Sequence, residues 1–297
     1  MAAASPTIAV LFFSHVFDRI SLSRLEQLRK ETEDIASFFV LTDNAAAPLD
    51  KCNANFHVFN FQELLEEYPA ALGNAVIPGN THLAIIDFFN AHPNFEHYWI
   101  VEYDVHFSGN WRDFFSAFKD SQADLICSHL RRYRDEPRWN WWSSFSLPRG
   151  GVDKEQFLRS FLPIQRLSKR AIRLLENRVR EGWRGHLEGL VPTILSLEGY
   201  RLEDFGGSGN FVRAGYRNKF YTSRGFFGYG GLTLLGSMRW RPPHLVRGLR
   251  RNRLYHPVKP TGLGASEIFR NSERLVRRIL GAMKIPLKKW LVRQDTE

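Results

Sequence analysis

The sequence has few cysteines, no long apolar run and no nucleotide-binding glycine motif, and each absence excludes a class of protein. Only Cys52 and Cys127 occur among 297 residues, so a disulfide framework or a metal-thiolate cluster is excluded and a reducing compartment is the simplest inference. No segment approaches the roughly 18 apolar residues that a membrane span needs. The apolar run 8–13 is too short for a secretory signal and lacks a basic segment before it. We therefore expect a soluble, cytoplasmic protein.

Two phosphate-binding motifs are also absent. The predicted first strand, residues 7–13, is followed by Ser14 and His15 and not by G-x-G-x-x-G, which argues against a dinucleotide-binding Rossmann site. The sequence has no Walker motif, which argues against a P-loop nucleotide hydrolase.

Charge is abundant but unevenly divided. Residues 1–127 carry 7 Lys and Arg against 17 Asp and Glu, a net of −10, whereas residues 128–297 carry 34 against 14, a net of +20. Six arginines and no acid occur within residues 239–253. This asymmetry says nothing about the fold, but it indicates that the C-terminal half meets an anionic partner: ligand phosphates, a lipid surface or nucleic acid.

Short apolar runs alternate with helical periodicity through the first half of the chain. Strands are predicted at residues 7–13, 38–41, 56–59, 98–105 and 124–127, and helices at 21–33, 62–67, 80–90 and 111–118. Ser21 or Ser23 is the expected cap of the first helix, and Asn80 that of the third. The alternation predicts an α/β protein with a parallel, doubly wound sheet.

The second half is less regular. Residues 130–151 are rich in Trp, Tyr and Arg, which is typical of a substrate-facing flap or, alternatively, of a packed aromatic plug. Helices are predicted at 169–180 and from about 185, with a short strand at 199–202 and a basic helical tail within 266–291. Because no linker divides the chain, we expect one catalytic domain, 1–260, with a nucleotide-binding half, 1–127, an acceptor-side half, 128–260, and a basic tail, 261–297.

The strongest site candidate is the end of the strand predicted at 98–105. Glu102 and Asp104 are separated by one residue, so on an extended backbone both side chains point to the same side and can address one hard cation. Ligands bind at the carboxyl ends of strands in open α/β sheets, and the break at Ser108-Gly109 places the acids there. The alternative is that both are ordinary strand-end charges in solvent.

Glu102-Tyr103-Asp104 resembles the D-x-D-type motif of GT-A fold glycosyltransferases, and the order of elements is similar over residues 7–260. The resemblance implies a GT-A-like, Rossmann-type, mostly parallel sheet flanked by helices, with an irregular basic C-terminal region. It also implies a nucleotide-sugar donor and Mn²⁺ or Mg²⁺. It implies that Asp104 is the metal ligand, as the last acid of the motif, while Glu102 stands where the family has Asp and lies on the donor side.

The same resemblance implies three further roles. Glu188, in His186-Leu187-Glu188, lies where inverting enzymes of this family carry the catalytic base, although a helix N-terminus favours any acid. His256 would bind the metal and Lys259 the departing diphosphate, although a lone His is more often structural. Ser14, His15 and Asp43 would contact the nucleoside by element order only. Asp204 competes as an acid for the metal or base role.

The leading hypothesis is therefore a cytoplasmic hexosyl- or related transferase of polysaccharide biosynthesis. The donor would be a nucleotide sugar, the acceptor a glycan, lipopolysaccharide or lipid-linked sugar, and the basic half would contact the anionic inner face of a membrane. A nucleotidyltransferase of related fold is one alternative. A non-enzymatic nucleic-acid-binding protein that uses the arginine run is another, although no nucleic acid partner is expected because the acids cluster at strand ends.

Overall fold

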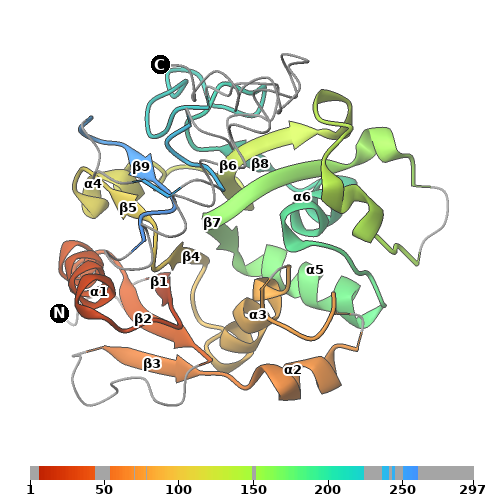
Figure 1. Cartoon of the computed structure of the whole chain (residues 1–297), viewed down its shortest axis with the longest axis horizontal. Coiled ribbons are helices and arrows are strands. Elements are labelled where there is room, and N and C mark those ends of the chain that lie inside the picture. The colour runs from red at the N-terminus through yellow and green to blue at the C-terminus, as the bar shows by residue number, and fades with distance from the viewer. Residues whose placement is uncertain are drawn as a thin grey trace, which may run out of the picture.

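The central feature of the molecule is a seven-stranded sheet (Figure 1). The computed structural model describes residues 7–43, 54–69, 71–77, 79–148, 152–223, 236–240, 243–244 and 250–259. The strand order is β3-β2-β1-β4-β7-β6-β8. The strands are β1 (Ile8–Phe13), β2 (Ser37–Thr42), β3 (Asn55–Val58), β4 (His97–Glu102), β6 (Leu125–Arg132), β7 (Leu158–Ser168) and β8 (Leu202–Asp204).

Most of the sheet is parallel, as predicted. Strands β3, β2, β1 and β4 run in the same direction, and β8 is parallel to β6. Strand β7 runs antiparallel to both of its neighbours, β4 and β6. The prediction of an α/β, mostly parallel sheet flanked by helices is confirmed.

Helices cover both faces of the sheet and form two cores. On one face α2 (Phe61–Glu67), α3 (Thr81–Ala91), α5 (Lys169–Arg180) and α6 (Leu187–Leu197) pack together. On the other face lie α1 (Arg19–Thr32) and α4 (Trp111–Ser116). Alternate residues of β1 enter the two cores, so the strand reads as one continuous apolar run.

The helices match the sequence predictions closely, with two corrections at their N-termini. Asp18, and not Ser21 or Ser23, caps α1, because its carboxylate accepts from the N–H groups of Ile20 and Ser21. The Asn80 side chain does not cap α3. It instead accepts from the N–H of Leu72 and donates to that residue's carbonyl, and so closes the preceding loop.

Strand β7 is the main element that the sequence analysis missed. Pro163 and two arginines interrupt its apolar pattern, although the whole strand is buried. The register between β6 and β7 shifts twice, which is the kind of irregularity at which a sheet tolerates proline. The buried guanidinium of Arg166 donates to the carbonyls of Phe118, Ser121 and Ala123, so its burial is compensated.

The aromatic loop, residues 133–148, is ordered against the start of α6. It contains the short 3₁₀ turns η1 (Tyr133–Asp135) and η2 (Asn140–Ser144), followed by a bridge between Ser146 and Arg184. Phe145 fills the space beside Gly185 and Gly189, where any Cβ would collide with its ring. Trp142 is buried whereas Trp141 is 36% exposed, so the loop combines features of the predicted plug and the predicted flap.

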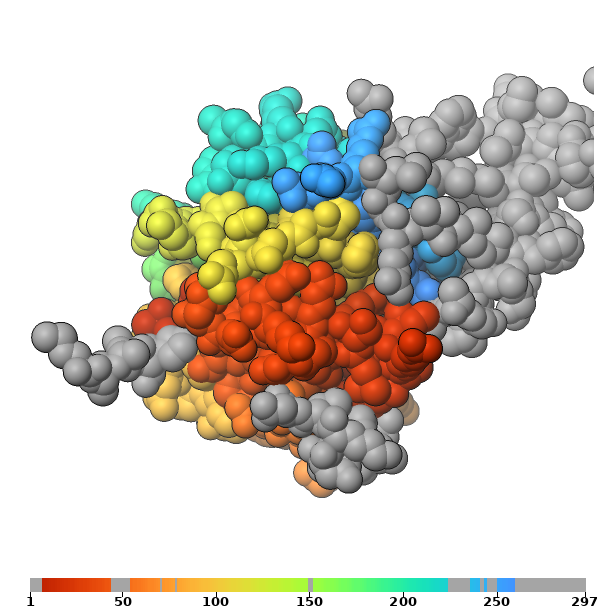
Figure 2. All heavy atoms as spheres, turned by 90° about the vertical axis from the view of Figure 1, so that its left-hand side faces the viewer, coloured from red at the N-terminus to blue at the C-terminus, as the bar shows by residue number. Residues whose placement is uncertain are grey.

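A small second sheet joins two distant parts of the chain. Strand β5 (His106–Phe107) pairs antiparallel with β9 (Leu254–Tyr255), and a third 3₁₀ turn, η3 (Lys154–Gln156), precedes β7. Figure 2 shows residues 250–259, in blue, against the yellow residues that follow β4, with the red helix α1 beside them. The predicted basic tail, 261–297, and part of the arginine run, residues 241–242 and 245–249, lie outside the described residues.

Candidate active site

The site is built at the carboxyl end of β4, beside the end of β1. Glu102 is the last residue of β4 and pairs with Phe13, the last residue of β1. The chain then turns: the N–H of Val105 donates to the carbonyl of Glu102 at 3.0 Å. Asp104 therefore lies within a turn, not on the strand that was predicted to extend to residue 105.

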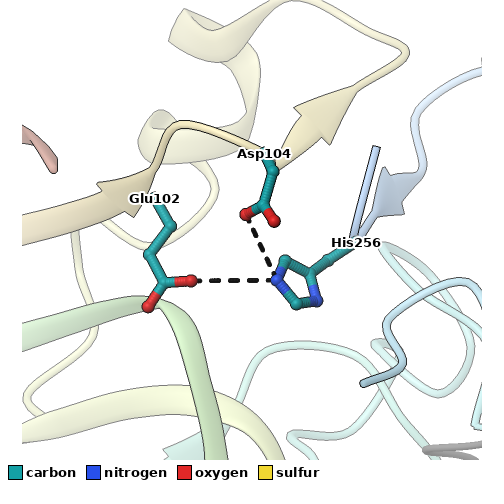
Figure 3. A group of neighbouring side chains, drawn as sticks. All are labelled: Glu102, Asp104 and His256. Atoms are coloured by element: carbon teal, nitrogen blue, oxygen red, sulfur yellow. Dashed lines mark ion pairs between the residues drawn. The ribbon is translucent and has the colours of Figure 1, made fainter. Parts of the chain in front are cut away.

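His256 meets both acids because β9 pairs with β5 immediately after that turn. Its Nε2 lies 3.2 Å from Asp104 Oδ1 and 3.7 Å from Glu102 Oε2 (Figure 3). Its Nδ1 lies 2.8 Å from the carbonyl oxygen of Arg239, which can only accept, so Nδ1 carries a proton. The backbone thus orients the ring and directs Nε2 at the two carboxylates.

Lys259 supplies a second cationic group to the same cluster. Its Nζ donates to Asp104 Oδ2 at 2.6 Å and to the hydroxyl of Tyr103 at 3.0 Å. Tyr103, the residue between the two acids, also receives the edge of the His15 ring. The structure therefore brings Glu102, Asp104, His256 and Lys259 together.

The two acids of the cluster differ in their electrostatics. Burial raises the pKa of Glu102, and the neighbouring charge of Asp104 raises it further. Burial alone would also raise the pKa of Asp104, but His256 and Lys259 outweigh that effect and hold it well below its usual range. The same contacts raise the pKa of His256 and of Lys259 despite their burial. Asp104 is thus the permanently charged member of the pair.

The donor set fits a divalent cation. One ligand atom each from Glu102, Asp104 and His256 lies within 4.8 Å of the others. Two carboxylate oxygens and an imidazole nitrogen held by a backbone carbonyl suit Mn²⁺ or Mg²⁺ completed by phosphate oxygens and water. Lys259 already neutralises one oxygen of Asp104, so a cation would share this carboxylate with the ammonium group.

Glu188 lies near the same cluster, because the charges of Glu102 and His256 influence its pKa. It lies in the first turn of α6, which packs on β7, the neighbour of β4. Ser160 of β7 donates to its carbonyl oxygen at 3.1 Å, and its own N–H donates to His186 Nδ1 at 3.4 Å. The predicted position at a helix start is confirmed.

The Glu188 carboxyl group is largely buried, and neighbouring charges of both signs act on it. Its side chain is 17% exposed, and burial raises its pKa to about 7. Arg159, His256 and the N–H of Leu162 lower the pKa, whereas the charge of Glu102 raises it. A carboxyl group with a pKa near neutrality can exchange protons at physiological pH, which a general base requires.

Arg159 was not predicted as a site residue, although its position among apolar residues indicates a buried partner. Arg159 lies in the apolar run at the start of β7, where a charged side chain needs a buried partner. Its guanidinium is fully buried, forms an ion pair with Glu136, and lies 5.9 Å from the centre of the Trp139 ring. It therefore links the aromatic loop to the surroundings of Glu188.

The remaining predicted residues are less closely tied to the cluster. Ser14 is buried, and its hydroxyl both donates to the carbonyl and accepts from the N–H of Val16, so it shapes the turn after β1. His15 is exposed and touches the cluster through Tyr103. Asp43 is exposed just after β2, two strands away from β4. Their proposed contacts with a nucleoside stay predictions.

Asp204, the competing acid, has a structural role. Its buried carboxylate accepts from the N–H groups of Gly206, Gly207 and Leu130 and from the hydroxyl of Tyr221. These four donors orient it toward the loop after β8. A separate concavity of about 660 Å³ opens at the amino ends of β4 and β6, between Glu96 and Arg201, at the edge of the sheet opposite to the site.

Comparison with solved structures finds similar folds among transferases. A glycosyltransferase involved in glycosylation of the major capsid of PBCV-1 is 11% identical, with a TM-score of 0.31 over 58% of this chain; this chain covers 64%, less than two thirds, of that structure. Mouse xyloside xylosyltransferase 1 is 12% identical, with a TM-score of 0.40 over 69% of this chain and 87% of its own.

A nucleotidyltransferase is similar to the same degree. The 4-diphosphocytidyl-2C-methyl-D-erythritol synthase of Anaerococcus prevotii is 8% identical, with a TM-score of 0.41 over 67% of this chain and 88% of its own. No protein-family model matches the sequence, and no curated protein matches it. At such low identities and TM-scores the GT-A-like fold class rests on the strand order and pairing of this chain itself.

Proposed function

We propose that this protein is a glycosyltransferase that moves a sugar from a nucleotide-sugar donor to an acceptor hydroxyl with inversion of configuration. The observation that carries the proposal is a charged cluster with a buried, titratable carboxyl group near it. Asp104, His256 and Lys259 form the cluster. The Glu188 carboxyl, whose pKa is about 7, is close enough to feel the charges of Glu102 and His256.

The chemistry follows from this arrangement. The acceptor hydroxyl attacks the anomeric carbon, the bond from that carbon to the diphosphate oxygen breaks, and the diphosphate leaves with the bonding electrons. Glu188 takes the proton of the hydroxyl as general base. Lys259 lies beside the cluster and can pair with the departing phosphate as a point charge. Attack and departure on opposite faces of the sugar invert the anomeric configuration.

Asp104, His256 and Glu102 would hold a divalent cation, which would stabilise the negative charge of the leaving diphosphate. Lys259 and His256 lie beside the same carboxylate of Asp104. The cluster therefore presents an excess of positive charge to phosphate once a cation is bound. We assign Ser14 and His15, at the end of β1, to the nucleoside side of the site.

The acceptor side is formed by the start of α6 and the aromatic loop. Trp141 stacks on His186, the capping residue of α6, with ring centroids 4.5 Å apart and an interplanar angle of 27°. An exposed indole beside the base suits a sugar ring, so a glycan or lipid-linked glycan is the proposed acceptor. A cytoplasmic location with peripheral contact to an anionic membrane is proposed from the basic composition. Among the described residues, helices of the length and apolarity needed to cross a membrane are absent.

Thermal unfolding with UDP, GDP and their sugars, with and without Mn²⁺, tests the donor site. A ligand at about 100 times its dissociation constant stabilises the native state by about 2.7 kcal/mol. We expect one nucleotide to raise the melting temperature further when Mn²⁺ is present. Asp104→Asn should remove the metal-dependent part, whereas Asp113→Asn, an exposed Asp in the first turn of α4, should retain it.

The reaction product distinguishes a glycosyltransferase from a nucleotidyltransferase. NMR of the reaction with the stabilising nucleotide sugar should show release of a nucleoside diphosphate and a product of inverted anomeric configuration. Release of pyrophosphate from a nucleoside triphosphate would instead indicate the nucleotidyltransferase alternative. If no nucleotide shifts the melting temperature under any condition, the proposed function is wrong.

A further inference from the structure

One buried arginine joins the two chain segments that supply the charged cluster. Arg24 lies in α1, and its Nη1 donates to the carbonyl of Tyr103 at 3.0 Å and to the carbonyl of Val258 at 2.7 Å. These partners are 79 and 234 residues away in the sequence. A single guanidinium nitrogen thus bridges segments that meet only through folding.

The two carbonyl groups occupy matching places in the site. Tyr103 stands between Glu102 and Asp104, and Val258 stands between His256 and Lys259. The N–H of Val258 also donates to the carbonyl of Asp104 at 2.8 Å. The two segments are therefore joined through their backbones by one direct bond and by the bridge through Arg24, in addition to the side-chain contacts of His256 and Lys259.

The position of this arginine on its helix is unusual. The buried face of α1 consists of Ser21, Arg24, Leu25, Leu28 and Thr32. Arg24 therefore lies on the side of the helix that faces the sheet, where arginine is costly unless its donors are satisfied. An apolar residue would pack there at less cost, so the bonds that Arg24 makes account for its presence.

Two carbonyl oxygens that approach one another repel unless a donor lies between them. The Nη1 group of Arg24 is this donor for the carbonyl oxygens of Tyr103 and Val258. A charged donor forms a stronger hydrogen bond than a neutral one. The spacing between the acids and His256 consequently depends on the guanidinium group, because the carbonyl groups are attached to the backbone beside each ligand.

We propose that Arg24 is a positioning residue that fixes the distance between the Glu102–Asp104 turn and the His256–Lys259 segment. The inference rests on the proposed function, because it concerns the cation site of that reaction. Arg24 touches neither donor nor acceptor in this scheme. It acts through Tyr103 and Val258, as residues behind metal ligands commonly do.

Binding of Mn²⁺ alone, measured by the EPR signal of the free ion, tests the proposal without a substrate. Arg24→Met should weaken Mn²⁺ binding about 10- to 100-fold, the usual effect of losing a group that orients metal ligands. Arg24→Lys should be intermediate, since an ammonium group retains the charge but reaches less far. Arg29→Met is the matched control on the same helix, because Arg29 pairs with the surface acids Glu26 and Glu33.

Hydrogen exchange gives a readout that does not need the ion. The amide of Val258 should exchange at least about 10-fold faster in Arg24→Met, because the guanidinium bridge that holds the Val258 segment beside Asp104 is then lost. Amides of β1 should exchange as in the wild type, which shows that the sheet is intact. Unchanged exchange at Val258, or unchanged Mn²⁺ affinity in a wild type that binds Mn²⁺, would overturn the positioning role. Absence of Mn²⁺ and nucleotide binding in the wild type contradicts the proposed function, and the exchange result alone then decides the role of Arg24.

Discussion

Asp104 and Glu188 carry the same functional group, yet the protein shifts their pKa values in opposite directions. Asp104 is surrounded by cations, His256 at 3.2 Å and Lys259 at 2.6 Å, which hold its pKa well below the usual range. Glu188 lies at the start of a helix in dry surroundings, where burial raises its pKa to about 7.

The difference assigns complementary roles to the two acids. A carboxylate that stays charged at all physiological pH values suits the binding of a cation, since no proton competes with the metal. A carboxyl group that titrates near neutrality suits proton transfer. Separated pKa values of this kind distinguish the members of catalytic acid pairs in general. Neither role would follow from exposure alone, because both side chains are mostly buried.

Removing the charge of Glu188 should abolish the difference in role between Glu188 and Asp104, and we expect it to have the largest effect on the rate. Glu188→Gln keeps the shape of the side chain but cannot accept a proton, so kcat should fall about 100- to 10,000-fold. In the wild type kcat/KM should rise with pH through about 7, as Glu188 loses its proton. The residual activity of the variant should lack this rise. Initial rates from pH 5 to 9 provide the measurement.

The control for this variant is Glu66→Gln, an exposed glutamate of α2, which should retain the wild-type rate and pH profile. Glu102, Arg159 and His256 also face Glu188 and influence the profile. Retention of the rise near pH 7 in Glu188→Gln would assign it to one of these groups, and retention of kcat would remove Glu188 from the reaction.

Removing the ammonium group of Lys259 tests the role of the cations around Asp104. Methionine matches the length of lysine, so Lys259→Met removes mainly the charge. A hydrogen bond to a charged group contributes about 1.5–3 kcal/mol, so kcat/KM for the donor should fall about 10- to 100-fold. Mn²⁺ affinity should not fall in parallel, because the carboxylate of Asp104 loses a competing cation.

Lys119→Met, a change of an exposed lysine after α4, is the matched control and should leave donor kinetics unchanged. Donor titrations at fixed acceptor, together with Mn²⁺ binding, separate the two effects. Equal loss of donor and Mn²⁺ affinity in Lys259→Met would mean that the ammonium group maintains the fold of the cluster and does not bind phosphate.

Local patterns in the sequence were sufficient to predict most of the fold. The apolar run of β1 and the three- and four-residue spacing of α5 predicted both elements with nearly the observed bounds. Strand β7 could not be predicted in the same way. Its proline lies at a register shift, Arg166 bonds to distant carbonyl groups and Arg159 pairs with Glu136. The stability of the strand therefore depends on contacts that no local window contains.

The candidate site was predictable in part for a related reason. The acid pair at a strand end is a local signal, and Glu102 and Asp104 do lie at the carboxyl end of β4. The meeting of His256 with these acids depends on the pairing of β5 with β9 across about 150 residues, which the sequence indicates only through the family resemblance. Arg24 carried a local signal, an arginine on the apolar stripe of a helix, but its partners are again distant.

The smallest predicted effect concerns stability and tests the Glu188 side of the comparison without catalysis. The pKa of this carboxyl group is about 7 in the folded protein against 4.5 in the unfolded chain. Between these values the native state binds more protons than the unfolded state, so its stability falls as pH rises from about 4.5 to about 7. Above pH 7 the Glu188 carboxylate is charged, and the free energy that its burial costs no longer changes with pH.

Glu188→Gln stays neutral at every pH and should therefore be more stable than the wild type above pH 7. One pKa unit corresponds to about 1.4 kcal/mol, and because the side chain is partly exposed we expect a gain of about 1–3 kcal/mol at pH 8. The gain should shrink as pH falls and vanish near pH 4.5. Urea unfolding of both proteins at pH 4.5, 6 and 8, with Glu66→Gln as the reference, measures this difference. A gain that did not change with pH would show that the glutamine packs better, and that the Glu188 carboxyl is not held in the dry environment that its proposed role as base requires.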